Sequence, residues 1–331
     1  MADPPPVLVE VTRGDRVESR HRGHAVVVDD IGAIIAAWGD PQTLIYPRSA
    51  AKMLQALPLL ESRAGGALSD AHLALACASH SGATIHTSRV TAWLADLGLD
   101  ETALRCGPQP PNDRDARAAL NGAEPTQVHN NCSGKHTGFL TLAQHLKAGP
   151  NYIDADHPVQ RAARAAMEDM AQEDSPGWGI DGCSAPNFAF TLAGFGRALA
   201  LMAAPDRLAR TRATAAERLV RAMMAHPDLV AGEGRACTRL MRVMPGHLAL
   251  KTGAEGVFAA ILPARRMAVA LKIEDGATRA SEAAIAALLV HLGVLDPADP
   301  RVRAFTHAPI FNRRNIETGH TRAVQTAFAG G

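Results

Sequence analysis

The chain has 331 residues, is 47% hydrophobic and carries 34 basic against 33 acidic side chains, so it can bury a large core and has almost no net charge. This balance argues against nucleic acid or an anionic membrane as the main partner, and no apolar run approaches the roughly 18 residues of a membrane-spanning helix. An odd count of five cysteines and a first segment without signal-peptide features predict reduced thiols and a cytoplasmic protein.

Three groups of elements are predicted along the chain. The chain opens with three strand-like runs, at residues 7–12, 20–28 and 33–38. Turn residues separate them, which favours an antiparallel meander. A helical middle follows, with helices at residues 49–61, 69–78, 84–97, 135–146, 158–172, 191–203 and 206–225. Three late strands are predicted at residues 247–251, 256–262 and 267–273. A closing helix at residues 278–292 and an irregular tail follow them.

Strands at both ends of the chain around a helical middle indicate an α/β fold. We expect a single catalytic domain, residues 1–331, in which an antiparallel sheet flanked by helices is built from residues 7–48 and 235–293. Residues 49–234 would form a mainly helical second lobe. The site is expected between this lobe and the sheet.

The first candidate site is the segment YPRSAAK at residues 46–52. Ser49 would lie in the first turn of a helix, where free backbone N–H groups favour a developing negative charge, and Lys52 would lie one turn further along the same face. A neutral lysine amine can accept the proton of a serine hydroxyl. Only five of the 34 basic residues are lysines, and arginine cannot act as a base, so a lysine in this position indicates chemistry. Ser-x-x-Lys with a late Lys251-Thr252-Gly253 is the pairing of penicillin-binding proteins and serine β-lactamases, which predicts a serine–lysine hydrolase.

Two further polar regions could contribute to the site. Residues 77–82 (CASHSG) could supply a second hydroxyl, although a serine-rich helix end is the simpler interpretation. Residues 129–136 (HNNCSGKH) are matched downstream by residues 179–184 (GIDGCS). A tetrahedral zinc shell could be formed there by Cys132, Lys135, Cys183 and Asp181. Free cysteines are also common as small buried hydrophobic residues.

Taken together and in this order, these motifs resemble the Rhizobium-type, or class 3, L-asparaginases over residues 7 to about 293. The resemblance implies a fold similar to serine β-lactamases and glutaminases, a homodimer, and hydrolysis of L-asparagine to L-aspartate and ammonia. The site residues that it implies are Ser49 with Lys52 and Ser79 with Lys251 for catalysis, Arg48, His136 and Asp181 around the substrate, and Cys132, Lys135 and Cys183 for zinc. Asp181 would reach the metal through water or hydrogen-bond the substrate.

In the expected mechanism, Ser49 attacks the side-chain amide carbon while Lys52 accepts its proton. Ser79 and Lys251 would orient groups or relay protons, and zinc would position the substrate rather than activate water. Glutamine is an alternative substrate, because one methylene discriminates by only about 1–3 kcal/mol. A β-lactam is another, although enzymes that act on β-lactams normally work outside the cytoplasm. A third alternative is a non-catalytic protein that binds zinc or an amino acid.

Overall fold

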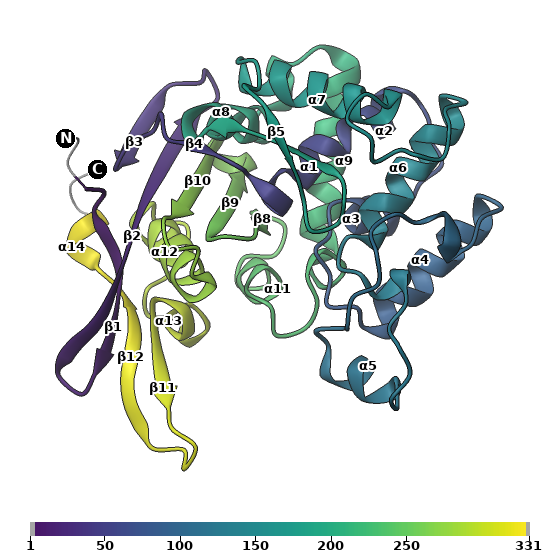
Figure 1. Ribbon diagram of the computed structural model, residues 1–331. Helices are drawn as coiled ribbons and strands as arrows, with labels where there is room; N and C mark the ends of the chain where they lie inside the picture. Colours follow the sequence, from purple (N-terminus) through teal and green to yellow (C-terminus); the bar gives the residue numbers. More distant parts are fainter. Residues whose placement is uncertain (1–3, 329–331) are drawn as a thin grey trace.

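The computed structural model describes residues 4–328 and is built around an antiparallel sheet (Figure 1). Within these residues the sheet has eight strands, and along its main path they are β11 (His307–Phe311), β12 (Glu317–Ala323), β1 (Val7–Arg13), β2 (Arg16–Asp29), β10 (Met267–Ile273), β9 (Val257–Leu262) and β8 (Ala249–Thr252). The eighth strand, β3 (Ile34–Trp38), pairs with β2. All pairings are antiparallel. The predicted α/β class, the opening meander and the joining of strands from both chain ends are confirmed.

The long strand β2 connects the two halves of the sheet. Its first half pairs with β1, and its second half, from Gly23 to Asp29, pairs with β10. Every residue of β9 is buried, which requires cover on both faces of the sheet. The helices α8 (Leu192–Ala203) and α12 (Thr278–His291) pack against this region.

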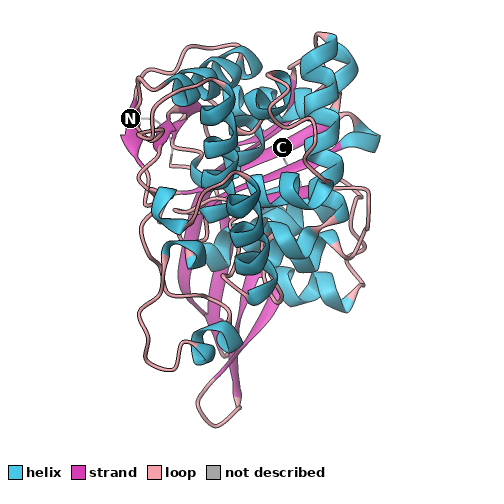
Figure 2. Cartoon of the chain, turned by 90° about the vertical axis from the view of Figure 1, so that its right-hand side faces the viewer, coloured by secondary structure: helices cyan, strands magenta, loops and turns pink. Residues whose placement is uncertain are grey.

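The helical lobe lies beside the β8 edge, and Figure 2 shows its helices in front of the strands. Its helices are α1 (Lys52–Gln55), α2 (Leu57–Glu61), α3 (Asp70–Ala76), α4 (Thr84–Asp96), α5 (Arg114–Ala119), α6 (Ser133–His145), α7 (Pro158–Ala171), α9 (Arg210–Ala225) and α10 (Pro227–Val230). The backbones of α3 and α6 touch, because a side chain at Gly134 would overlap the Leu75 carbonyl. This contact places the segments that follow α3 and precede α6 next to each other.

The single helix predicted over residues 49–61 is wrong. The segment forms a 3-10 turn at Arg48–Ala51, then α1 and α2, with Ala56 between the two helices. Pro58 lies in the first turn of α2 and has no N–H to donate to the Leu54 carbonyl, so a continuous helix is interrupted there.

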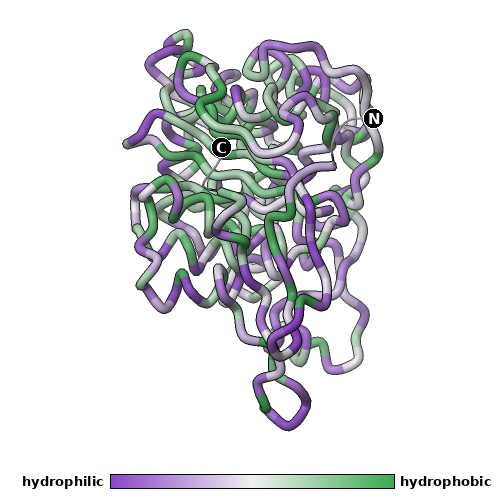
Figure 3. The backbone as a smooth tube through the Cα atoms, turned by 90° about the vertical axis from the view of Figure 1, so that its left-hand side faces the viewer, coloured by the Kyte–Doolittle hydropathy of each residue, from purple (hydrophilic) through white to green (hydrophobic). Residues whose placement is uncertain are grey.

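The prediction of an irregular tail after residue 293 is also wrong. The tail forms α13 (Pro300–Thr306), β11, β12 and α14 (Gln325–Phe328). β12 pairs with β1, with Val9 opposite Ala323, so the tail completes one edge of the sheet beyond the expected 235–293 segment. The turn between β11 and β12 projects from the molecule, and Figure 3 shows that it is largely hydrophilic. β11 and β12 are largely exposed or half-buried, which explains why apolar periodicity did not reveal them.

Candidate active site

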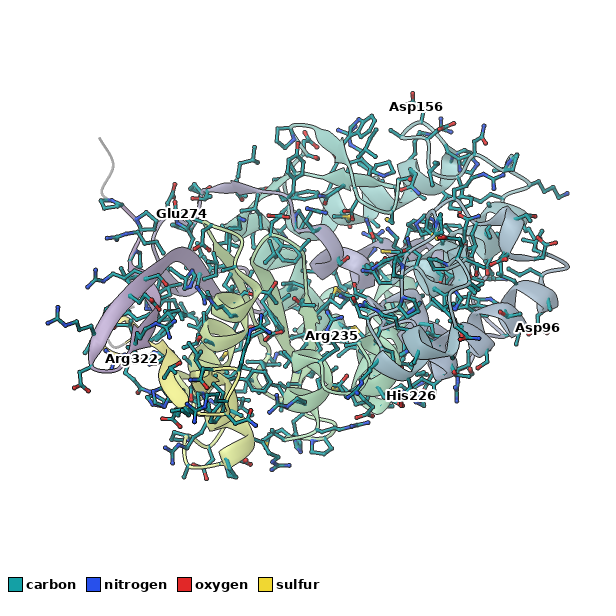
Figure 4. The ribbon with its side chains drawn as sticks, turned by 60° about the horizontal axis from the view of Figure 1, so that its bottom comes forward. Asp96, Asp156, His226, Arg235, Glu274 and Arg322 are labelled. Atoms are coloured by element: carbon teal, nitrogen blue, oxygen red, sulfur yellow. The ribbon has the colours of Figure 1, made fainter. Side chains whose placement is uncertain are left out.

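Segments from distant parts of the chain meet where β8 borders the helical lobe. A Cβ atom at Gly253, just after β8, would lie 2.8 Å from the carbonyl oxygen of Pro47, so this strand end touches the turn that carries Ser49. Ser79 follows α3, and its N–H donates to the Val230 carbonyl at 2.9 Å. In Figure 4, Arg235, which precedes α11 (Ala236–Met241), lies between the sheet half of the molecule and the helical half.

Ser79 lies between two lysine amines. The Lys52 amine donates to the Ser79 hydroxyl oxygen at 3.0 Å and also to the Ala78 carbonyl. The Lys251 Nζ atom lies 2.8 Å from the same hydroxyl oxygen and donates to the Thr252 carbonyl at 2.7 Å. Ser79 is 5% exposed and both lysines are 1% exposed. The structure therefore brings together three of the four predicted catalytic side chains.

The fourth, Ser49, is half-buried in the 3-10 turn Arg48–Ala51. Within residues 4–328, no hydrogen bond joins its hydroxyl to the amine of Lys52, which points to Ser79, Ala78 and Cys132 instead. The expected spacing of the two residues is present, but Lys52, the proton acceptor expected for Ser49, lies beside Ser79 instead.

The two lysines around Ser79 differ in their partners. Lys52 Nζ has three, the Ala78 carbonyl, Ser79 and the Cys132 sulfur at 3.1 Å, which matches the three N–H groups of an ammonium. Lys251 Nζ has two. Burial and the nearby charge of Lys52 lower the pKa of Lys251 to about 7. A neutral Lys251 amine can donate to Thr252 and accept the proton of Ser79.

A cluster of two thiols and an amine lies next to this group. Cys132, Lys135 and Cys183 are all buried, and Lys135 Nζ lies 3.1 Å from the Cys183 sulfur. The neighbouring Cys132 side chain, helped by Lys135, holds the pKa of Cys183 well below its ordinary value, whereas Cys183 and burial raise the pKa of Cys132. Burial lowers the pKa of Lys135, but the two sulfurs outweigh it and the net direction is upward.

The donor set of this cluster fits zinc, which prefers sulfur and nitrogen ligands. Residues 4–328 contain no group of three or more His, Cys, Asp or Glu side chains that could hold a metal ion. A zinc ion here would therefore need Lys135 as a ligand besides the two cysteines, and its binding would release protons from these groups.

Arg48 and Asp181 form an ion pair near the thiol cluster. Arg48 reaches one oxygen of the Asp181 carboxylate with Nε at 2.9 Å and a terminal nitrogen at 2.7 Å, and the Gly182 N–H donates to the same oxygen at 2.7 Å. Arg48 has a φ of +51°, and its own N–H donates to the side-chain oxygen of Asn187. A non-glycine residue in this conformation is often found at functional sites. The pair offers both charges that a zwitterionic amino acid would need.

Two residues that the sequence analysis did not single out support the predicted ones. Asn187 holds the backbone of Arg48, and Tyr152 holds the ring of His136 through a 2.9 Å hydrogen bond to Nδ1. His136 itself is fully buried beside Lys135 and Cys183. Tyr152 is one of only two tyrosines, and this scarcity was the available signal.

The chain was compared with known proteins. No curated protein matches it in sequence. Among solved structures, it is similar to a protein from Bacteroides dorei described as a beta-lactamase, with 13% identity, a TM-score of 0.44, and 76% of this chain and 84% of that chain covered. It is also similar to a beta-lactamase from Mycobacterium bovis, with 12% identity, a TM-score of 0.43, and 81% and 94% covered.

The decisive comparison is with protein families. The model of the L-asparaginase II family matches residues 9–323, nearly the whole chain. In the described residues, 4–328, no helix is long and apolar enough to cross a membrane. The family expected from the sequence motifs is thereby confirmed: the chain belongs to the L-asparaginase II family and is an asparaginase-type amidohydrolase.

Proposed function

We propose that this enzyme hydrolyses L-asparagine to L-aspartate and ammonia through serine–lysine nucleophilic catalysis. One observation carries the proposal: a buried serine hydroxyl lies within 3.0 Å of two lysine amines, and the pKa of one of them, Lys251, is lowered to about 7. A nucleophilic hydroxyl needs a base within hydrogen-bond reach that is neutral at working pH. Lys251 meets both requirements for Ser79.

The hydrogen bonds support a different division of labour from the one expected from the sequence. Neutral Lys251 takes the proton of Ser79, whose oxygen attacks the side-chain amide carbon of the substrate. Lys52, with the partners of an ammonium, stabilises the negative charge that develops on the Ser79 oxygen. The protonated Lys251 then gives its proton to the leaving nitrogen, ammonia departs, and water hydrolyses the ester on Ser79. Ser49 would contact the substrate from the adjoining turn.

The Arg48–Asp181 pair would recognise the substrate's ionic end. The guanidinium suits the α-carboxylate and the Asp181 carboxylate suits the α-ammonium group, so both parts of the ion pair gain a partner when the amino acid binds. Such a site favours free amino acids over peptides. It does not measure side-chain length, so glutamine remains the competing substrate.

Zinc is part of the proposal as a group held by Cys132, Lys135 and Cys183. When bound, it would supply a positive charge that positions the substrate. None of the proton transfers above passes through it. We also propose that the 34.8 kDa chain forms the expected homodimer, which sedimentation velocity would measure.

Covalent trapping tests the assignment of the nucleophile. An L-asparagine analogue with a diazoketone in place of the amide would alkylate the attacking oxygen, and peptide mass spectrometry would locate the label. We expect it on Ser79 in the wild type and in Ser49→Ala, with no label in Ser79→Ala. A label on Ser49 that persists in Ser79→Ala would return the attack to Ser49, as the sequence analysis expected.

Ammonia release tests the reaction itself. We expect release from L-asparagine to exceed release from L-glutamine, and no opening of a chromogenic β-lactam. Faster release from glutamine would reassign the substrate while keeping the chemistry. If zinc-loaded protein released ammonia from neither amino acid and took no label, the hydrolase proposal would fail and a binding protein would be the better explanation.

A further inference from the structure

The Tyr152 hydroxyl is a fully buried hydrogen-bonding group outside the serine–lysine cluster. Tyr152 has 0% exposure, and its oxygen accepts the backbone N–H of Arg105 at 2.8 Å. The same oxygen lies 2.9 Å from Nδ1 of His136. In residues 4–328, these are the two partners of the hydroxyl group.

These partners fix where the protons lie. The Arg105 N–H can only donate, so the hydroxyl hydrogen of Tyr152 must go to the remaining partner, Nδ1 of His136. Nδ1 is then an acceptor and carries no proton. An imidazole ring always carries at least one N–H, so the proton of His136 is on Nε2.

The Nε2 atom faces the thiol cluster. It is buried and has no hydrogen-bond partner among the described residues, and the Cys183 side chain lies beside the ring. A buried N–H without a partner is costly. If the Nε2–H group donates to the Cys183 sulfur, the buried N–H gains a partner, and Cys183 gains a second donor besides Lys135.

We propose that Tyr152 is a positioning residue, which fixes the Nε2–H tautomer of His136 and thereby directs one hydrogen-bond donor at Cys183. Such outer contacts orient ligand side chains and commonly change metal affinity 10- to 100-fold. The effect on catalysis rests on the proposed function, whereas the tautomer does not. Tyr46 is the other tyrosine of the chain, and because it is half-exposed, at 48%, Tyr46→Phe serves as the comparison variant.

Nitrogen NMR of the protein labelled with ¹⁵N-histidine tests the tautomer directly, because long-range proton–nitrogen correlations distinguish Nε2–H from Nδ1–H. The His136→Gln variant identifies the signal. We expect Nε2–H in the wild type and in Tyr46→Phe, and a mixture of tautomers in Tyr152→Phe. A wild-type Nδ1–H tautomer, or an unchanged tautomer in folded Tyr152→Phe, would overturn the proposal.

A double-mutant cycle tests whether Tyr152 acts through His136. Zinc affinity, measured by competition with a chromophoric chelator, should fall about 10-fold or more in Tyr152→Phe and remain unchanged in Tyr46→Phe. In the His136→Gln background, where the amide nitrogen of Gln can replace Nε2, Tyr152→Phe should cause no further loss. Equal losses in both backgrounds would refute action through His136. A protein without asparagine turnover would refute the proposed function, but the tautomer measurement would still decide this proposal.

Discussion

Replacing Lys251 by methionine tests the central electrostatic feature of the site. Methionine has a similar length but no charge, and Lys251 is almost completely buried. Its pKa falls from 10.5 to about 7. At about 1.4 kcal/mol per pKa unit, the folded protein holds the protonated amine about 5 kcal/mol less favourably than the unfolded chain does.

The sign of the pH dependence follows from proton binding. Between pH 7 and 10.5 the unfolded chain holds a proton on this lysine that the folded protein lacks, so the free energy of unfolding rises with pH in this window. Over pH 7–9.5 we expect a rise of about 3 kcal/mol that Lys251→Met does not show. The same deprotonation should make kcat/KM of the wild type increase through about pH 7, and Lys251→Met should release no ammonia.

Urea unfolding at a series of pH values from 6 to 9.5 gives the measurement, with wild type and variant compared at each pH. Lys147→Met is the matched control, because Lys147 is exposed and its loss should leave the pH dependence of wild type in place. If the wild-type and Lys251→Met curves ran parallel across this range, Lys251 would not be neutral at pH 7 and could not serve as the base.

Three other changes follow from contacts at the edges of the site. Gly253→Ala places a Cβ atom 2.8 Å from the Pro47 oxygen and should lower kcat about 10-fold or more together with a loss of thermal stability; unaltered kinetics would contradict this coupling of strand and turn. Arg48→Lys cannot keep both nitrogen contacts to Asp181 and should raise KM more than it lowers kcat in steady-state kinetics, and an unchanged KM would argue against a substrate contact. Deleting residues 294–331 removes the strand paired with β1 and should give protein without cooperative thermal unfolding by circular dichroism, whereas a normal transition would show that this edge is dispensable.

The segments of the candidate site could be predicted from the sequence because their chemistry is unusual for this chain. Three of its five lysines, Lys52, Lys135 and Lys251, are buried, and a chain that uses arginine for its other positive charges marks such lysines clearly. The motif spacing also led to the correct family. The expected pairing of Ser79 with Lys251 is present. The spacing of Ser49 and Lys52 did not reveal that Lys52 also contacts Ser79, because that contact depends on where the segment after α3 lies in the fold.

The supporting residues could not be predicted for a related reason. Tyr152 lies 16 positions from His136 and outside any periodic element, so its hydrogen bond depends on how the chain after α6 returns to that helix. The buried face of β12 consists of Gly319, Thr321 and Ala323, which give little apolar signal; this strand is fixed by pairing with β1, and β11 pairs in turn with β12. Sequence reading detects periodic apolar residues, and neither the Tyr152 hydrogen bond nor the small residues of β12 produce that pattern.

The serine–lysine group and the thiol cluster form one electrostatic unit. Two amines that contact the same hydroxyl oxygen repel each other when both are charged, so one of them is driven to the neutral form. Among the described residues, Lys52 has three hydrogen-bond partners, including the Cys132 sulfur, whereas Lys251 has two, the Thr252 carbonyl and Ser79. The contact between Lys52 and Cys132 gives Lys52 a partner that Lys251 lacks, which is consistent with the proposed role of Lys251 as the base. A substitution in the thiol cluster should consequently affect proton transfer at Ser79 even though no sulfur touches that hydroxyl.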